Sequence, residues 1–437
     1  MSTNSSMESA SVERTDLESS GTGSAGQPGK ASMGEFFRNR FVRAILMSGL
    51  FLQLGIWVRN FAVLLYVMEK TNNDPTAVSL ISVAEFAPIF LFSFIGGTFA
   101  DRWRPKRTMV WCDFLSAISV FVVLLTLLTG TWQVIFFATL VSAILSQFSQ
   151  PSGMKLFKLH VPAEQIQMGM TMYQTMFAMF MIIGPSLGTF VYQTYGIHWS
   201  VGIMGVAFLL SAGTLLFLPP DRLEEQATTT SLGEEMKAGV RYVMQRPVLR
   251  SMAGGFVGAG LAVGLIQPLG VFVVMELLGE PKEFIQWLLM INGVAMIVGG
   301  GMAMTIGKKI PPQMMLAIGM VVSAVTVAVI GFSTNLYITL AAQFLSGLVM
   351  PFIQIGINTM MLNATEEAFI GRVNGILNPL FIGMMVISMS LAGWLKGLTS
   401  LSITYLIGAV FFTIGLLAIL PLFKLLPKKT ENAELKS

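Results

Sequence analysis

The sequence predicts an all-α membrane protein with twelve transmembrane helices in two pseudo-symmetric six-helix bundles. Of the 437 residues, 54% are hydrophobic and only 11% are charged, whereas a soluble domain carries about 25% charged residues. The mean hydropathy is +0.71. Long charge-free runs such as residues 403–423 lack the period-two alternation of a barrel, and helices satisfy every backbone polar group in hydrocarbon. The composition argues against a soluble enzyme, a nucleic-acid binder and a disordered chain.

Twelve apolar segments are long enough to cross the hydrocarbon core, which takes about 20 residues. They cover roughly 43–67, 77–100, 108–129, 131–152, 166–193, 197–218, 251–277, 284–306, 312–333, 335–361, 374–398 and 401–423. We expect a disordered tail over 1–33, an N-terminal six-helix bundle over 34–218, a linker with an amphipathic helix over 219–250, a C-terminal six-helix bundle over 251–424 and a second tail over 425–437.

The basic residues are distributed unevenly over this map. Of the 27 Lys and Arg residues, 23 lie in the tails, the linker and the loops that an even number of spans places on one face. Because positively charged loops stay on the cytoplasmic side, we expect a multi-pass protein of the cell membrane with both termini in the cytoplasm.

The two halves have the features of an internal repeat. The pair Gly96-Gly97 near the end of the second span recurs as Gly300-Gly301 near the end of the eighth, 204 residues later. Glu164 before the fifth span recurs as Glu367 before the eleventh, 203 residues later. Two similar bundles place a substrate cavity between the halves near the midplane, which opens when one half rocks against the other.

The loop after the second span resembles the signature Gly-x3-Asp-Arg-x-Gly-Arg-(Arg/Lys) of the major facilitator superfamily. It departs where Arg104 replaces a glycine and Pro105 replaces a basic residue. The resemblance implies the major facilitator fold and a latch at the cytoplasmic gate that breaks when the halves rock; the alternative is that its basic residues only set the topology. The latch residues are Gly97, Asp101, Arg102, Lys106 and Arg107.

A second motif lies in the fifth span. The segment Gly184-Pro185-Ser186-Leu187-Gly188 resembles the Gly-Pro-x-x-Gly-Gly signature of the antiporter, or exporter, branch of that superfamily, with Thr189 in place of the last glycine. Proline kinks a helix, and Gly184 and Gly188 permit close packing against a neighbour. The resemblance implies export, whereas the alternative is a packing kink without directional meaning.

Three ionisable residues lie well away from the ends of the predicted spans, where a charge costs several kcal/mol unless it is paired or hydrated. Arg59 lies about 24 Å along the first span, and Glu85 lies about 12 Å down the second span from the other face. We hypothesise that they pair or share a water-filled cavity and that Glu85 couples transport to protons; the alternative is a static ion pair. Asp113 in the third span is a second candidate for proton coupling, with packing or gating as its alternative.

Neutral polar residues inside the spans usually join helices. The spans that line the path in the family nevertheless supply five candidates for substrate contact, namely Gln53, Asn60, Gln147, Gln267 and Gln354. The 31 methionines and 32 phenylalanines would suit a cavity for varied apolar cargo, although ordinary packing explains any single one.

No motif of an enzyme is present. The sequence has no phosphate-binding loop, no His-Glu-x-x-His and no Gly-x-Ser-x-Gly. Its single cysteine and two histidines exclude an intrachain disulfide and a multi-histidine metal site. We therefore expect no catalytic residue, cofactor or metal.

The function that these features favour is secondary active export of small amphipathic or hydrophobic molecules by alternating access, in exchange for protons. The resemblance to exporters suggests cargo of the multidrug, macrolide or siderophore type. We expect a monomer whose partners are a small-molecule substrate, protons and the bilayer, without nucleic acid. The alternatives are a flippase for lysophospholipids or lipids on the same fold, a non-transporting membrane scaffold or sensor, and uptake instead of export.

Overall fold

The structure is a computed structural model, and it describes residues 33–127, 132–219, 232–307 and 309–425. The predicted disordered tails lie outside these residues, apart from residue 33 in the first and residue 425 in the second. For residues 93–102 the backbone is described and the side chains are not.

The N-terminal half contains a short helix followed by five long ones. They are α1 (Met33–Arg38), α2 (Arg40–Lys70), α3 (Pro75–Arg102), α4 (Pro105–Leu127), α5 (Val134–His160) and α6 (Ala163–Leu216). The range of α6 covers the predicted fifth and sixth spans, which meet at a kink at Gly196, where a φ of 78° breaks the helical geometry. Glycine adopts this left-handed conformation without steric cost.

The linker and the C-terminal half follow in the order that the sequence predicts. The elements are α7 (Leu232–Gln245), α8 (Pro247–Ile266), η1 (Gln267–Leu269), α9 (Gly270–Phe272), η2 (Val273–Leu277), η3 (Lys282–Phe284), α10 (Ile285–Ile306), α11 (Pro312–Phe332), α12 (Leu336–Ala364), η4 (Glu367–Phe369), α13 (Ile370–Leu398), α14 (Leu401–Ile419) and α15 (Leu422–Leu425). The seventh span begins at Pro247, four residues before the predicted boundary at 251. Within the described residues, eleven helices are long and apolar enough to cross a membrane. One of them spans Met168–Leu216 and contains two predicted spans, so the all-helical fold with twelve crossings is confirmed.

Local chemistry sets several helix starts. The side chains of Asn39 and Asn335 accept hydrogen bonds from backbone N–H groups of the first turns of α2 and α12, and the hydroxyl of Ser400 does the same for α14. Asn and Ser are favoured at this position because their oxygens satisfy N–H groups that have no partner within the helix. Proline begins α8, where its missing N–H costs nothing.

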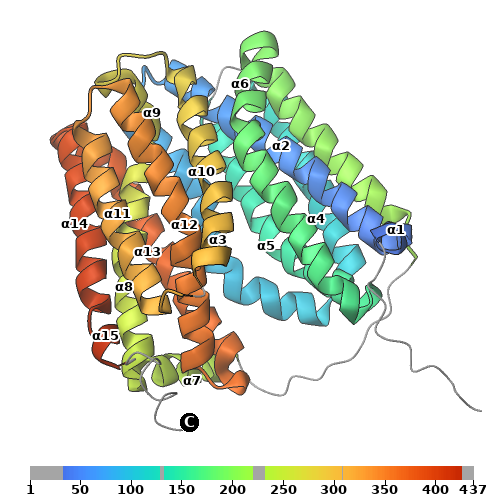
Figure 1. Cartoon of the computed structure of the whole chain (residues 1–437). Coiled ribbons are helices and arrows are strands. Elements are labelled where there is room, and N and C mark those ends of the chain that lie inside the picture. Colours follow the sequence, from blue (N-terminus) through green and yellow to red (C-terminus); the bar gives the residue numbers. More distant parts are fainter. Residues whose placement is uncertain (1–32, 128–131, 220–231, 308, 426–437) are drawn as a thin grey trace, which may run out of the picture.

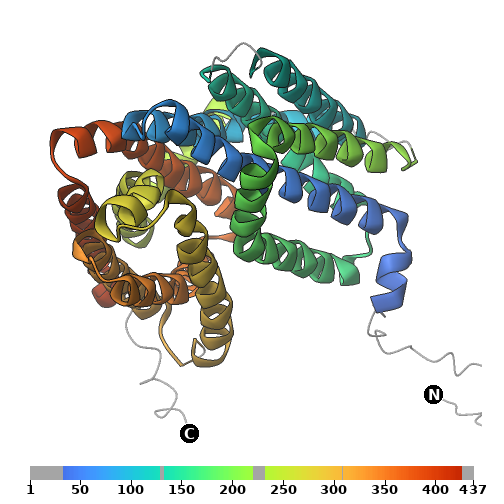
Figure 2. The ribbon, with the colours of Figure 1, turned by 90° about the horizontal axis from the view of Figure 1, so that it is seen from above.

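The packing of the N-terminal half recurs in the C-terminal half. Helix α4 packs on α5, as α11 packs on α12. Helix α3 also packs on α5, as α10 packs on α12. The two bundles lie side by side in Figure 1 and in the view from above in Figure 2. The architecture therefore repeats, as the sequence offset predicts.

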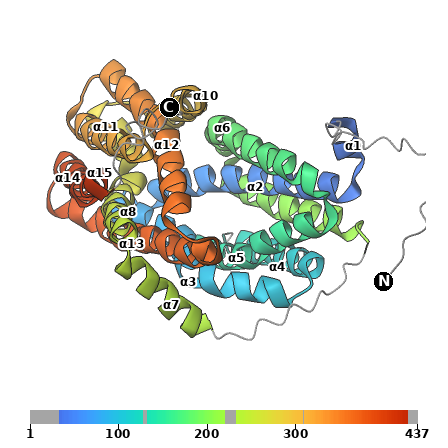
Figure 3. The same ribbon diagram turned by 60° about the horizontal axis from the view of Figure 1, so that its bottom comes forward.

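The two ends of the bundles differ in charge. We call the end that carries α1, α7 and α15 the basic end, and the other the opposite end. Exposed basic side chains at the basic end include Arg38, Arg107, Lys158, Arg250 and Lys424. Figure 3 shows this end, with α7 at its edge beside α13.

The halves contact each other mainly through the helix pairs α3 with α13 and α6 with α10, and α3 also contacts η1. At the opposite end, Lys282 Nζ donates to the backbone carbonyl of Leu65 over 3.4 Å. Farther along, the ring of Phe90 packs on Gly383, where a Cβ atom would lie 2.6 Å from it. Since Phe90 and Gly383 each lie 15 residues from the opposite end of their helices, these contacts extend about 22 Å down the bundle.

Helix α7 packs on α13 and on η4, which precedes α13 in the chain. The ring of Tyr242 stacks on that of Phe369, with 4.2 Å between the ring centroids. The Arg246 guanidinium also lies over the Tyr242 ring, 4.2 Å from its centroid. Arg246 also forms an ion pair with Glu366. The opposite surface of α7 exposes an apolar stripe of Met236, Val240 and Met244.

Candidate functional site

Arg59 and Glu85 meet inside the N-terminal half, as their estimated depths predict. One guanidinium nitrogen of Arg59 lies 4.0 Å from the nearer Glu85 carboxylate oxygen. Asn60 lies between them: its Oδ1 accepts from Arg59 Nε over 2.9 Å and from Nη2 over 2.5 Å, and its Nδ2 donates to Glu85 Oε1 over 2.8 Å. The Asn60 amide therefore links the cation to the carboxylate. We call Arg59, Asn60 and Glu85 the charge cluster.

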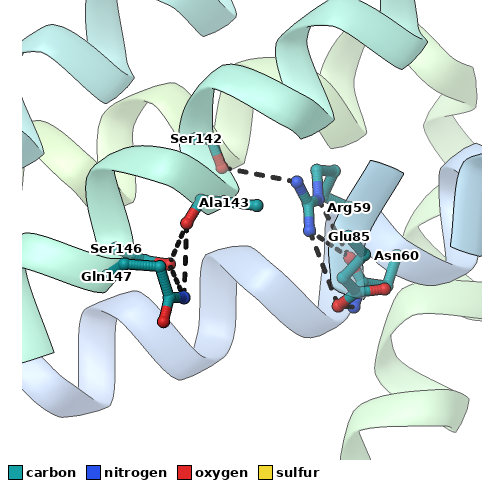
Figure 4. Close-up of polar contacts among 7 residues, drawn as sticks. All are labelled: Arg59, Asn60, Glu85, Ser142, Ala143, Ser146 and Gln147. Atoms are coloured by element: carbon teal, nitrogen blue, oxygen red, sulfur yellow. Dashed lines mark hydrogen bonds and ion pairs between the residues drawn. The ribbon is translucent and has the colours of Figure 1, made fainter. Parts of the chain in front are cut away.

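The two charged side chains of the cluster differ in exposure. The Arg59 side chain is 8% exposed, whereas that of Glu85 is 31% exposed. The remaining guanidinium nitrogen of Arg59 donates to Ser142 Oγ on α5 over 3.4 Å (Figure 4). A buried charge is tolerated only with partners, and here the cation has three, from α2, α3 and α5. The carboxylate is therefore the more exposed of the two charged groups.

Asp113 is the most buried carboxylate among the described residues, with 2% exposure. Its Oδ2 accepts from Ser211 Oγ on α6 over 2.5 Å, and its Oδ1 accepts from Ser149 Oγ on α5 over 3.4 Å. Ser48 Oγ on α2 lies 2.6 Å from Ser211 Oγ. Because the single hydroxyl hydrogen of Ser211 points at Asp113, Ser48 donates to Ser211. Hydroxyls from three helices thus surround this carboxylate.

The glycines of the fifth-span motif pack against α2. A Cβ atom at Gly188 would lie 2.7 Å from Phe61 Cβ and 2.9 Å from the Trp57 carbonyl oxygen, and one at Gly184 would lie 2.6 Å from the Trp57 indole. Pro185 lies between them, inside α6. Close packing at the two glycines therefore follows the sequence-based expectation, while a role of the motif in export stays a prediction.

The predicted latch is only partly described. Gly97, Asp101 and Arg102 belong to the backbone of α3, but their side chains lie outside the described part of the structure. Lys106 Nζ donates to the carbonyl of Leu216 over 3.1 Å and also to that of Leu218, at the end of α6. Arg107 is exposed at the basic end. A cation at the C-terminal end of a helix satisfies its free carbonyls, so Lys106 joins α4 to α6.

The five candidates for substrate contact do not form one group. Asn60 belongs to the charge cluster, and Gln53 is buried on α2. Gln147 donates to the carbonyl of Ala143 and to Ser146 on its own helix (Figure 4). Gln267 and Gln354 are exposed on elements of the C-terminal half. Within the described ranges, no hydrogen bond joins any two of these five residues.

Two features of the site escape sequence reasoning. The serines around Asp113 come from three helices, and isolated serines in apolar spans give no periodic signal. The bridge formed by Asn60 could have been found only from its position next to Arg59.

Among the described residues, no three His, Cys, Asp or Glu side chains come close enough to hold a metal ion.

Two repeated bundles of membrane-spanning helices with buried polar groups define a polytopic membrane transporter. The model of the Major Facilitator Superfamily matches residues 45–281 and 252–437. The chain belongs to this superfamily, and the predicted family and fold are confirmed.

Relatives and solved structures agree with the family. The chain is 24% identical over 418 residues to the uncharacterized MFS-type transporter YkuC of Bacillus subtilis (strain 168), covering 91% of this chain and 95% of YkuC. It is 25% identical over 357 residues to the multidrug efflux pump Tap of Mycolicibacterium fortuitum, covering 78% of this chain and 86% of Tap. The fold is similar to that of the nucleoside transporter NupG, with a TM-score of 0.70, 15% identity, and coverage of 88% of this chain and 99% of NupG.

Proposed function

We propose that the protein exports small amphipathic or hydrophobic molecules in exchange for protons, and that the charge cluster performs the coupling. The observation that carries this proposal is the bridge from Arg59 through Asn60 to Glu85, a buried cation joined to a carboxylate that is 31% exposed. Ionisable residues inside a membrane are expensive and are retained at ion and substrate pathways. The similarity to the multidrug efflux pump Tap supports export of drug-like cargo.

The charge cluster offers a simple coupling step. With Glu85 ionised, the carboxylate accepts from Asn60 and attracts the guanidinium 4.0 Å away. A proton on Glu85 removes that attraction, which is strong in a medium of low dielectric constant. Arg59 then remains as an uncompensated charge held by Asn60 and Ser142. Proton binding at Glu85 therefore changes the contacts between α2 and α3.

The rocking motion would use the contacts between the halves. The halves are joined at the opposite end through Lys282 with Leu65, and about halfway along α3 and α13 through Phe90 with Gly383. Alternating access requires these contacts to break while contacts at the basic end form. The orientation that we propose places the basic end in the cytoplasm, because basic loops stay there.

Asp113 is the second proposed proton site. Ser211 and Ser149 donate to its two oxygens from different helices. A neutral carboxylic acid can itself donate a hydrogen bond, so protonation of Asp113 would rearrange the hydroxyls among α4, α5 and α6.

The proposal is tested by proton movement in vesicles that contain the purified protein. Addition of a transported compound from a panel of drugs, siderophores and lysolipids to wild-type vesicles is expected to move protons in the opposite direction. Glu85→Gln keeps the hydrogen-bond geometry and removes the titration, so it is expected to abolish this proton signal. Glu367→Gln, an exposed carboxylate at the basic end, is the matched control and is expected to keep it.

The panel also separates the alternatives. Proton movement that responds only to lysolipids would favour the flippase, and movement in the same direction as the compound would favour uptake. A Glu85→Gln protein with the proton signal of wild type would refute the coupling role.

A further inference from the structure

Four amide side chains are exposed at similar depths in the spans near the basic end. They are Gln150 on α5, Gln174 on α6, Gln354 on α12 and Asn378 on α13. Each lies between 8 and 11 residues from the basic end of its helix, or about 12–17 Å at 1.5 Å per residue. Among the described residues, the amides of Gln150, Gln174 and Gln354 have no hydrogen-bond partner, and that of Asn378 donates to Asn374 over 3.0 Å. Their hydrogen-bonding capacity is therefore available to a ligand.

Each amide lies on a different side of its helix from an exposed apolar residue nearer the opposite end. Nine residues from each amide, toward the opposite end, an apolar side chain is exposed: Val141 by 40%, Ile183 by 43%, Leu345 by 49% and Ile387 by 51%. Nine residues are about two and a half helical turns, so each amide lies on the opposite side of its helix from this apolar residue. Three further apolar side chains are exposed on the same side as an amide, namely Met154, Phe177 and Met350. An exposed amide that faced lipid would lack hydrogen-bond partners, so we infer that the four amides face the space between the halves.

The four positions follow the internal repeat. Gln150 and Gln354 are separated by 204 residues, and so are Gln174 and Asn378. The same offset relates Val141 to Leu345 and Ile183 to Ile387, and it is the offset of the paired glycines. Two equivalent pairs of amides thus come from equivalent helices of the two halves. Amides placed independently in the two halves would not be expected to share this offset of 204 residues.

The four amides lie in spans without charge. Residues 141–154, 171–187, 345–362 and 374–390 contain no Asp, Glu, Lys or Arg. The charge cluster is farther away, because Glu85 lies 17 residues from the basic end of α3, which is about 26 Å. A solute entering from the basic end would meet neutral donors and acceptors before it met Glu85.

We propose that Gln150, Gln174, Gln354 and Asn378 form an amide collar, an uncharged hydrogen-bonding site for neutral solutes that carry hydroxyl, amide or ester groups. Each amide supplies two N–H donors and one carbonyl acceptor, so the collar binds such groups without ion pairing. This inference names the substrate class within the proposed function and rests on it. Lipophilic cations without hydrogen-bonding groups gain nothing from the collar.

The placement of the collar is tested by spin labelling of the full-length protein in lipid bilayers. The background is Cys112→Ala, since Cys112 is the only cysteine. Nitroxides at Gln150→Cys and Gln354→Cys are expected to collide more with a water-soluble nickel chelate than with oxygen. Nitroxides at Val141→Cys and Leu345→Cys are expected to show the reverse. Labels at positions 150 and 354 that collide mainly with oxygen would place these residues in lipid and overturn the collar.

The ligand class is tested by equilibrium binding to the purified protein in nanodiscs, which requires neither transport nor protons. Chloramphenicol is a neutral probe with hydroxyl and amide groups, and tetraphenylphosphonium is a cation with none. The double substitution Gln150→Leu with Gln354→Leu is expected to weaken chloramphenicol binding about tenfold, as the loss of two hydrogen bonds does, and to change tetraphenylphosphonium binding by less than about twofold.

Matched variants keep this test decisive. Gln193→Leu removes an exposed amide of α6 near the opposite end and is expected to bind both probes as wild type does. Gln354→Met retains the length of the side chain and removes the amide. It replaces the double variant in the binding test if the double variant does not fold. Equal losses for both probes, unchanged chloramphenicol binding in the variants, or no chloramphenicol binding at millimolar concentration would each overturn the ligand class. A failure of the proposed function would appear instead in the vesicle proton signal.

Discussion

The contact between α2 and α6 at Gly188 permits a graded test of packing. Replacement by alanine would place a methyl carbon 2.7 Å from Phe61 Cβ and 2.9 Å from the Trp57 carbonyl oxygen. Neither atom lies at the flexible end of a side chain, so the helices must separate. Overpacking of this kind costs about 1–3 kcal/mol, which exceeds the gain of at most about 1 kcal/mol from replacing glycine by alanine in a helix.

Two other glycines of α6 provide variants with which the stability of Gly188→Ala is compared. At Gly213 a methyl group meets nothing within 4 Å, so Gly213→Ala is expected to leave stability unchanged or to raise it by up to about 1 kcal/mol. At Gly184 the methyl would meet the Trp57 indole at 2.6 Å, and a ring can shift more easily than backbone. The expected order of stability is therefore Gly213→Ala, then Gly184→Ala, then Gly188→Ala, with about 1–3 kcal/mol between the first and the last.

The assay is the free energy of unfolding from denaturant titration in mixed micelles, with helix content as the signal. The three alanine variants differ from wild type by one methyl group each, so the unfolded states are comparable. Equal unfolding free energies for Gly188→Ala and Gly213→Ala would show that α2 and α6 are not in close contact at this level, and would refute the packing argument.

Three further predictions concern other parts of the molecule. Asp113→Asn retains an acceptor for Ser211, so it is expected to fold and to flatten the pH dependence of transport; a pH profile identical to that of wild type would exclude Asp113 as a proton site. Lys106→Met loses the bonds to the carbonyls at the end of α6 and is expected to lower the unfolding free energy by about 0.5–1 kcal/mol, whereas Lys106→Arg is expected to retain it. A nitroxide at Val240→Cys, on the exposed apolar stripe of α7, is expected to collide with oxygen at the membrane surface, and collision mainly with a water-soluble chelate would contradict this.

The fold was largely predictable because the bilayer imposes one requirement on every span. Apolar length and basic loops place the helices, and the observed bounds extend the predicted spans mainly at their ends. The fifth and sixth spans meet at a kink at Gly196, which lies in the gap that the sequence predicts between residues 193 and 197.

A contact within the site was predictable only where the depths of two residues along their spans are enough to bring them together. Arg59 and Glu85 could be expected to meet because residue counts along two adjacent spans fix their heights. The partners of Asp113 could not be found in this way. Ser149 and Ser211 approach it because α4 packs on α5 and α6, and Ser48 reaches Ser211 because α2 packs on α6. The rotation of each helix about its axis decides such contacts, and weakly amphipathic spans do not reveal it.

The central claim is that Glu85 couples solute movement to protons, and its most direct test compares two fluxes in the same liposomes. One flux is solute accumulation driven by an imposed pH gradient, and the other is exchange of labelled for unlabelled solute without a gradient. We predict that Glu85→Gln retains the exchange and loses the gradient-driven accumulation, because the halves still rock while no proton binds. Accumulation by Glu85→Gln at the level of wild type would contradict the account.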